Sequence, residues 1–157
     1  MLRWAKGRDR IDVLLAQSQL ERVAANRELA EEYLAQSRAH LRTSTTVAGT
    51  DPVGEFQLAY DSARKALASL LIVQGLRPTS TGGHVALYEA VLAQFDPPLG
   101  SVFKNFGWMR PLRNDSEYPS LDRPVASGDD ANAGRAAAAL IVDAATRLLD
   151  QLPPYGR

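Results

Sequence analysis

The chain has 157 residues, 45% of them hydrophobic and 23% charged, which is the size and composition of one ordinary globular domain. Its 18 Lys and Arg residues balance its 18 Asp and Glu residues, so overall charge cannot attract nucleic acid or an acidic membrane, and any such site must be a local patch. The absence of cysteine excludes disulfides and thiolate metal sites, and the two histidines, His40 and His84, are too far apart in sequence to indicate a zinc site. We expect neither a metal nor a cofactor.

The first part of the chain is predicted to be helical. Residues 9–23 have apolar positions at helical spacing, and residues 24–42 form a second helix that continues from the first or follows a bend. The apolar stretch at residues 11–16 is too short and interrupted for a signal peptide. No stretch reaches the roughly 18 apolar residues of a membrane helix. We therefore expect a cytoplasmic protein without a membrane segment.

The third helix is the most clearly marked. A polar loop at residues 43–50 leads to Asp51, whose carboxylate can accept a free backbone N–H, and Pro52 suits a first helical turn. Apolar residues then recur every three or four positions as far as Val73, and Gly75 is a suitable C-terminal stop. This pattern predicts a core helix.

The remaining elements are also predicted to be helices. A fourth begins at Ser80 or Thr81 and ends at Asp96, and a fifth runs from near Pro98 until Pro111 breaks or kinks it. A short helical turn covers residues 113–118, a loop covers residues 120–128, and a last helix covers residues 129–152. The sequence thus predicts an all-α, up-and-down bundle of five or six helices. We expect one domain spanning 1–157, with an N-terminal helix in 1–23 and a core bundle in 24–152.

Three features together resemble HEPN domains. The first is the helix at residues 56–71, in which an aromatic residue and Asp61 precede small residues and a leucine-rich end. The second is Gly75, followed by a Thr- and Gly-rich loop and His84. The third is Arg113-Asn114 followed by Tyr118, which is similar to the family's arginine–polar–x–histidine motif. The resemblance covers roughly residues 24–150.

The resemblance implies a concrete function. Many HEPN proteins are metal-independent ribonucleases that dimerise so that two arginine motifs face one shared cleft. Many are toxins encoded beside a nucleotidyltransferase that neutralises them, and others are non-catalytic modules that bind nucleic acid or a partner. We therefore expect an RNA-targeting homodimer in a toxin–antitoxin or stress-response system. The alternative is a non-catalytic interaction or RNA-binding module that works with a partner such as a nucleotidyltransferase.

The chain departs from the catalytic pattern after Arg113. The family histidine would fall at residues 118–120, where this chain has Tyr, Pro and Ser, and no histidine follows Arg113 at all. An unperturbed tyrosine, with a pKa near 10, is a poor general base at neutral pH. In toxins paired with a nucleotidyltransferase, the tyrosine that is modified lies two residues past the histidine. Tyr118 is not in that register, so this role is not carried over to it.

Four residues are nevertheless candidates for catalysis. Arg113 can hold a phosphate through its planar fork, and Asn114 can orient Arg113 or bond the scissile group. Glu117, four residues further on, could act as the base, although its spacing equally fits a simple helical ion pair with Arg113. Tyr118 could stack on a base or donate a hydrogen bond. The alternative for the whole group is a polar cluster at a helix end.

Basic residues near Arg113 are candidates for RNA binding. Lys104 and Arg110 are interleaved with Phe103, Phe106 and Trp108, an arrangement that can hold single-stranded RNA by phosphate contact and stacking. The two cations could equally be solvated surface charges, and burial in the core is the stronger expectation for the three aromatic residues. For His84, a structural role in its loop competes with that of a remote acid or base in the cleft.

Overall fold

The computed structural model describes residues 4–156, so the ends of the predicted domain, residues 1–3 and 157, lie outside the described residues. The described chain is mainly helical, with a single two-stranded sheet. The helices are α1 (Arg8–Ala16), α2 (Arg27–Thr46), α3 (Pro52–Gln74), α4 (Gly83–Phe95), α5 (Gly100–Phe103), α6 (Asn105–Glu117) and α7 (Gly128–Leu149). The strands are β1 (Leu20–Arg22) and β2 (Leu76–Pro78). The predicted all-α bundle is therefore confirmed, with six longer helices and the four-residue α5.

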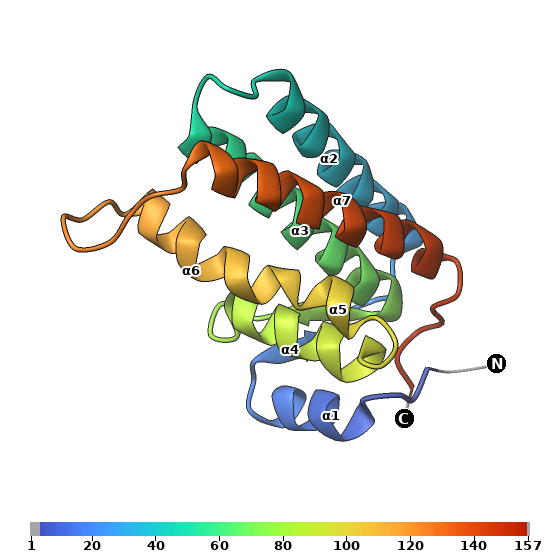
Figure 1. Ribbon diagram of the computed structural model, residues 1–157. Coiled ribbons are helices and arrows are strands. Elements are labelled where there is room, and N and C mark those ends of the chain that lie inside the picture. The colour runs from blue at the N-terminus through green and yellow to red at the C-terminus, as the bar shows by residue number, and fades with distance from the viewer. Residues whose placement is uncertain (1–3, 157) are drawn as a thin grey trace.

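Helix α3 is the centre of the bundle. It is buried along most of its length and contacts α2, α7, α6, α4 and β2. Figure 1 shows α2 and α7 beside α3, with α4, α5 and α6 below this group and α1 next to α4. Because α3 contacts four other helices and a strand, its side chains can contact residues from distant parts of the chain.

The ends of α3 confirm the prediction from local signals. The Asp51 side chain accepts a hydrogen bond from the Gly54 N–H at 3.0 Å, and Pro52 is the first helical residue. Gly75 ends the helix with φ of +79°, a conformation that costs glycine little. A Cβ atom at Gly75 would also lie 2.8 Å from the carbonyl oxygen of Val23, so a side chain does not fit there.

Small polar residues allow α2 to approach α3 closely. The Ser37 hydroxyl donates to the carbonyl oxygen of Ser62 at 2.6 Å, and the Ser62 hydroxyl donates back to the carbonyl of Ser37 at 2.7 Å. Both serines are fully buried, so these bonds satisfy polar groups that water does not reach. The pair holds the middle of α2 against the middle of α3.

A buried ion pair links α3 to α7. Glu55 is only 2% exposed, and Arg135 Nη1 lies 2.9 Å from its carboxylate. The other carboxylate oxygen accepts hydrogen bonds from the backbone N–H groups of Asp51 and Gly49, at 3.0 and 3.2 Å. Glu55 therefore connects the α2–α3 loop, the start of α3 and α7.

The predicted N-terminal helices need two corrections. The first helix ends at Ala16 rather than at residue 23, because residues 20–22 form a strand that pairs antiparallel with residues 76–78. The second helix begins after Asn26, whose side chain accepts from the Leu29 N–H at 2.9 Å, and it continues to Thr46. The predicted loop from residue 43 is therefore helical at its start, where threonine hydroxyls bond to carbonyls four residues earlier.

Pro111 does not break its helix, so of the predicted break or kink the break is wrong. Helix α6 passes through it as far as Glu117 and so includes the turn predicted for residues 113–118. Phe106 and Met109 in this helix are fully buried, and α6 packs against α3, α5 and α7. Tertiary packing thus outweighs the local preference of proline.

Two other helix boundaries also differ from the prediction. Helix α4 begins at Gly83 rather than at residue 80 or 81, and α7 ends at Leu149 rather than at residue 152. The start of α7 has a capping box, in which the side chains of Ser127 and Asp130 each accept from the other's backbone N–H. Among the helices of residues 4–156, none is long and apolar enough to cross a membrane.

Candidate functional site

Tyr60 on α3 lies at the centre of the candidate site. The residue is fully buried, and its ring stacks on Phe106 of α6 with ring centroids 4.9 Å apart. Its hydroxyl oxygen lies 2.7 Å from Nδ1 of His84, in the first turn of α4. Tyr60 therefore joins three helices at one point.

Three arginines lie close enough to this tyrosine and histidine for their charges to act on both. The guanidinium carbon of Arg113 lies 5.7 Å from the centroid of the Tyr60 ring, a cation–π distance. Arg64 lies one turn after Tyr60 on α3, and Arg110 lies nearly one turn before Arg113 on α6. All three positive charges act on both Tyr60 and His84. The sequence singled out Arg110 and Arg113, whereas it gave no indication of Arg64.

Burial controls the charge state of the two central groups. It raises the pKa of Tyr60 to about 12, although the three arginines act in the opposite direction. Burial and, to a smaller extent, the charges of the arginines together lower the pKa of His84 to about 4. At neutral pH the phenol is therefore protonated and the imidazole uncharged. A protonated phenol and an uncharged ring can share this hydrogen bond in either direction; with the Tyr60 O–H as donor to Nδ1, the remaining ring hydrogen of His84 lies on Nε2.

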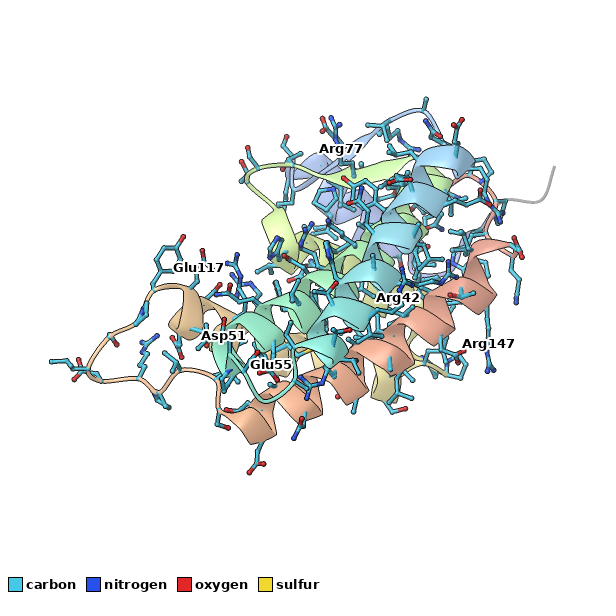
Figure 2. All side chains as sticks on the ribbon, turned by 90° about the horizontal axis from the view of Figure 1, so that it is seen from above. Arg42, Asp51, Glu55, Arg77, Glu117 and Arg147 are labelled. Atoms are coloured by element: carbon cyan, nitrogen blue, oxygen red, sulfur yellow. The ribbon has the colours of Figure 1, made fainter. Side chains whose placement is uncertain are left out.

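Most of the predicted catalytic residues lie close together. Arg113 Nη2 is 3.9 Å from a carboxylate oxygen of Glu117, and Arg113 Nη1 donates to Asn114 Oδ1 at 3.5 Å. The Arg113 side chain is 27% exposed, so it is neither locked inside the bundle nor fully in solvent. Glu117, labelled in Figure 2 at the end of α6, also accepts a hydrogen bond at 2.9 Å from Gln57 near the start of α3.

Carboxylates partly balance the arginines. Asp61 lies 3.3 Å from Arg64, and Glu117 makes the loose contact to Arg113 described above. Within residues 4–156, Arg110 forms no ion pair with a carboxylate. The three arginines and two carboxylates leave a small net positive charge, which favours an anion at this place.

Two predicted residues are not part of this cluster. Tyr118 follows the last residue of α6 and is 75% exposed, and Lys104 pairs with Asp96 at 3.2 Å. Of the interleaved aromatic residues, Phe103 and Phe106 are fully buried as expected, whereas Trp108 is substantially exposed. The residues predicted to bind RNA within 103–110 therefore do not form one surface. Two of the aromatic residues lie in the core, Lys104 belongs to a separate ion pair, and Arg110 lies on the same helix as Arg113.

His84 reaches the cluster because of the loop before α4. Thr79 accepts a hydrogen bond from the Gly82 N–H with its hydroxyl at 3.1 Å, and its carbonyl accepts from the Gly83 N–H at 2.8 Å. A Cβ atom at Gly82 would lie only 2.0 Å from the carbonyl oxygen of Gln19, so glycine is required there. The sequence signal for this geometry was the Gly82-Gly83-His84 triplet, but nothing in it indicated Tyr60 as the partner.

A cavity of about 580 Å³ adjoins the cluster. Its wall includes both Arg64 and His84, and the rest comes from the segment between β1 and α2, the first half of α2, the second half of α3 and the segment from β2 into α4. As for metal sites, the described residues contain no group of three or more His, Asp or Glu side chains that could hold an ion.

The cluster therefore joins Arg113, Asn114, Glu117 and Arg110 with Tyr60, Arg64 and His84. Comparison of the chain with protein-family models, with curated proteins and with solved structures finds no match.

Proposed function

We propose that this protein is an RNA-targeting protein of the HEPN type, which binds a phosphate of single-stranded RNA among Arg64, Arg110 and Arg113 and cleaves the strand without a metal ion. The observation that carries the proposal is the connection of His84 to Arg113 through Tyr60. It supplies a histidine beside the arginine, although the chain has none at residues 118–120.

Phosphate binding follows from the charges and donors in the cluster. Guanidinium groups form strong, paired hydrogen bonds to phosphate oxygens, and the uncharged His84 ring offers an additional N–H donor at Nε2. The contact of 3.9 Å between Arg113 and Glu117 is loose, so a phosphate can compete with the carboxylate for Arg113. A flexible single strand can bring a phosphate to a partly buried arginine more easily than a rigid duplex can.

Cleavage needs a base, an acid and a cation. In the proposed step, Glu117 removes the 2′-hydroxyl proton, and the 2′-oxygen attacks the phosphorus. Protonated His84 gives its proton to the leaving 5′-oxygen, and Arg113 stabilises the charge on the phosphorane. Burial, and after it the arginines, lower the pKa of the ring. The negative charge of the bound phosphate offsets the arginines and so favours the protonation of His84. The products are a 2′,3′-cyclic phosphate and a 5′-hydroxyl.

The test uses end-labelled single-stranded RNA in the presence of EDTA. We expect cleavage to cyclic phosphate ends by the unmodified protein, and a loss of roughly 10²–10⁴ in rate for His84→Gln, the usual contribution of a general acid. Arg113→Ala should weaken both binding and cleavage. Arg147→Ala is the matched control, because this exposed arginine pairs with Asp143 on α7 and belongs to no part of the cluster. Absence of RNA binding by the unmodified protein would refute the proposal.

A non-catalytic module is the second candidate function. It is favoured by the hydrogen bond from Gln57 to Glu117, because a carboxylate held by both Gln57 and Arg113 fits a structural role at the α3–α6 contact. In this case the protein binds RNA or a partner, such as a nucleotidyltransferase encoded beside it, without cutting. Binding of RNA without any cleavage product in the assay above would favour this function.

The biological setting proposed from the resemblance is a toxin–antitoxin or stress-response system, in which two copies of the chain share one cleft. We expect expression of the unmodified protein to arrest bacterial growth, and Arg113→Ala to relieve the arrest. Sedimentation of the purified protein should give the mass of a dimer. Equal growth with the two proteins would refute the proposed toxin role. Sedimentation as a monomer at micromolar concentration would refute the proposed cleft shared by two copies.

A further inference from the structure

The cavity beside the arginine cluster has the shape and lining of a ligand site. Its volume of about 580 Å³ lies within the range of pockets that hold small molecules. Its apolar lining residues include Leu29 of α2, Ala68 and Ile72 of α3, and Leu87 of α4. The remaining lining residues include polar groups, which can fix the orientation of a flat, mostly apolar ligand.

The cavity and the arginine cluster share part of their surface. Arg64 and His84 line the cavity, and the same two residues lie beside Tyr60 and Arg113 in the cluster. A phosphate bound to the cluster would thus lie at the edge of the cavity. In a nucleotide only the sugar separates the base from the phosphate. The base of the nucleotide whose phosphate binds the cluster is therefore close enough to enter the cavity.

We infer that this cavity binds one unpaired base of the RNA, next to the phosphate held by the arginines. The inference rests on the proposed function and extends it, because it assigns the substrate as a strand with a base turned out of the stack. Such bases are commonly held between aromatic or guanidinium planes and recognised at their edges.

The lining offers the groups that a base requires. Tyr33 of α2 and Arg64 of α3 provide flat surfaces for stacking. Asn26 uses its side-chain oxygen to cap α2 by accepting from the Leu29 N–H, which leaves its amide N–H groups for an acceptor on the base edge. On the far rim, Arg77 of β2, labelled in Figure 2, extends from the two-stranded sheet and is mostly exposed beside Glu21. It could contact the next phosphate of the strand.

The test compares two short oligonucleotides by fluorescence anisotropy, both with 2′-fluoro sugars so that they cannot be cleaved. One carries all its bases, and the other is abasic at every position. We expect the abasic strand to bind more weakly by roughly tenfold or more, which corresponds to the usual contribution of stacking one base. Equal binding of the two strands would overturn the inference and leave the proposed function intact.

A variant that fills the cavity gives an independent measurement. Ala68→Phe adds a ring to the lining of the cavity and should weaken binding of the base-bearing strand about tenfold, while binding of the abasic strand stays unchanged. Ala139→Phe makes the same change at an exposed position of α7 and should bind both strands as the unmodified protein does. If Ala68→Phe weakens both strands equally, or neither, the cavity does not hold a base. If the unmodified protein binds neither strand, the proposed function fails together with this inference.

Discussion

His84 should remain uncharged at pH values where an ordinary histidine is protonated. Burial and the nearby arginines lower its pKa from 6.5 to about 4 in the folded protein, whereas in the unfolded chain it titrates near 6.5. Between these values the unfolded chain binds a proton that the folded protein does not. The free energy of unfolding should therefore decrease as the pH falls from about 6.5 to about 4, and His84 should cause no further decrease below that range.

The size of this effect follows from the two pKa values. One pKa unit corresponds to about 1.4 kcal/mol, so the full separation sets a ceiling of about 3 kcal/mol. The ring lies at the edge of the cavity and is partly accessible, so solvent screening reduces the expected loss to about 2 kcal/mol. A loss of this size is a substantial fraction of the stability of a small domain.

Urea unfolding of the unmodified protein and of His84→Gln, at several pH values between about 7 and 4, measures this loss. The difference between the two proteins separates His84 from the carboxylates, which titrate in both. The ring can also be titrated directly by NMR, because the chain has only two histidines and His40→Gln assigns their signals. A His84 signal with a midpoint above about pH 6 would refute the burial argument, together with the charge state assigned to the site.

Three further predictions concern stability. Ser37→Ala should cost about 1–2 kcal/mol in urea unfolding, because the buried carbonyl of Ser62 loses a hydrogen-bond donor. Gly134→Val should cost about 1–3 kcal/mol, because a Cβ atom there would already lie 3.0 Å from the Phe56 ring. Burial alone would raise the pKa of Glu55, but hydrogen bonds from an arginine and two backbone N–H groups lower the pKa below 4.5 in the folded protein. The ionised Glu55 therefore stabilises the fold above pH 4.5, and this contribution is lost as the pH falls through the pKa of the folded state. The stability of Glu55→Gln, followed by circular dichroism during acid titration, should therefore depend less on pH below about 4.5.

Matched changes at exposed positions serve as controls for the first two of these variants. Thr43→Ala removes a hydroxyl that bonds only within α2, and Ala136→Val adds a branched side chain to an exposed position of α7. Both should change stability by no more than roughly 0.5 kcal/mol. Equal losses for a buried variant and its control would contradict the packing described for α2, α3 and α7.

Local signals were sufficient to predict α3. Asp51, Pro52 and Gly75 lie within one or two residues of the helix ends, and each acts on backbone groups next to it. The strand at residues 20–22 could not be found in this way, because its partner lies more than 50 residues away at residues 76–78. Pro111 misled the prediction for the opposite reason, since its local preference is outweighed by the burial of Phe106 and Met109 in the same helix.

The residues of the candidate site also fall into a group that local sequence patterns predict and a group that they do not. Arg113, Asn114 and Glu117 come together because they lie within one helical turn or so, which their spacing predicts. Tyr60, Arg64 and His84 join them only through the packing of α3 and α4 against each other and of α6 against α3. No pattern within a single segment carries that information.

The position of His84 leads to a prediction that tests whether a histidine must follow Arg113 in the sequence or must contact Tyr60 in the fold. If the HEPN pattern after Arg113 were sufficient, the double variant His84→Gln with Tyr118→His would regain the proposed RNA cleavage, because it places a histidine at residue 118. Position 118 follows the end of α6, and its present side chain is 75% exposed and belongs to no part of the cluster. A histidine there would be solvated and would lack the hydrogen bond from Tyr60 that orients the ring at position 84. We therefore expect the double variant to cleave no faster than His84→Gln alone in the end-labelled RNA assay. Recovery of even a tenth of the original rate would show that a solvated histidine close to Arg113 in sequence is sufficient, and that the contact between Tyr60 and His84 serves the fold rather than the chemistry.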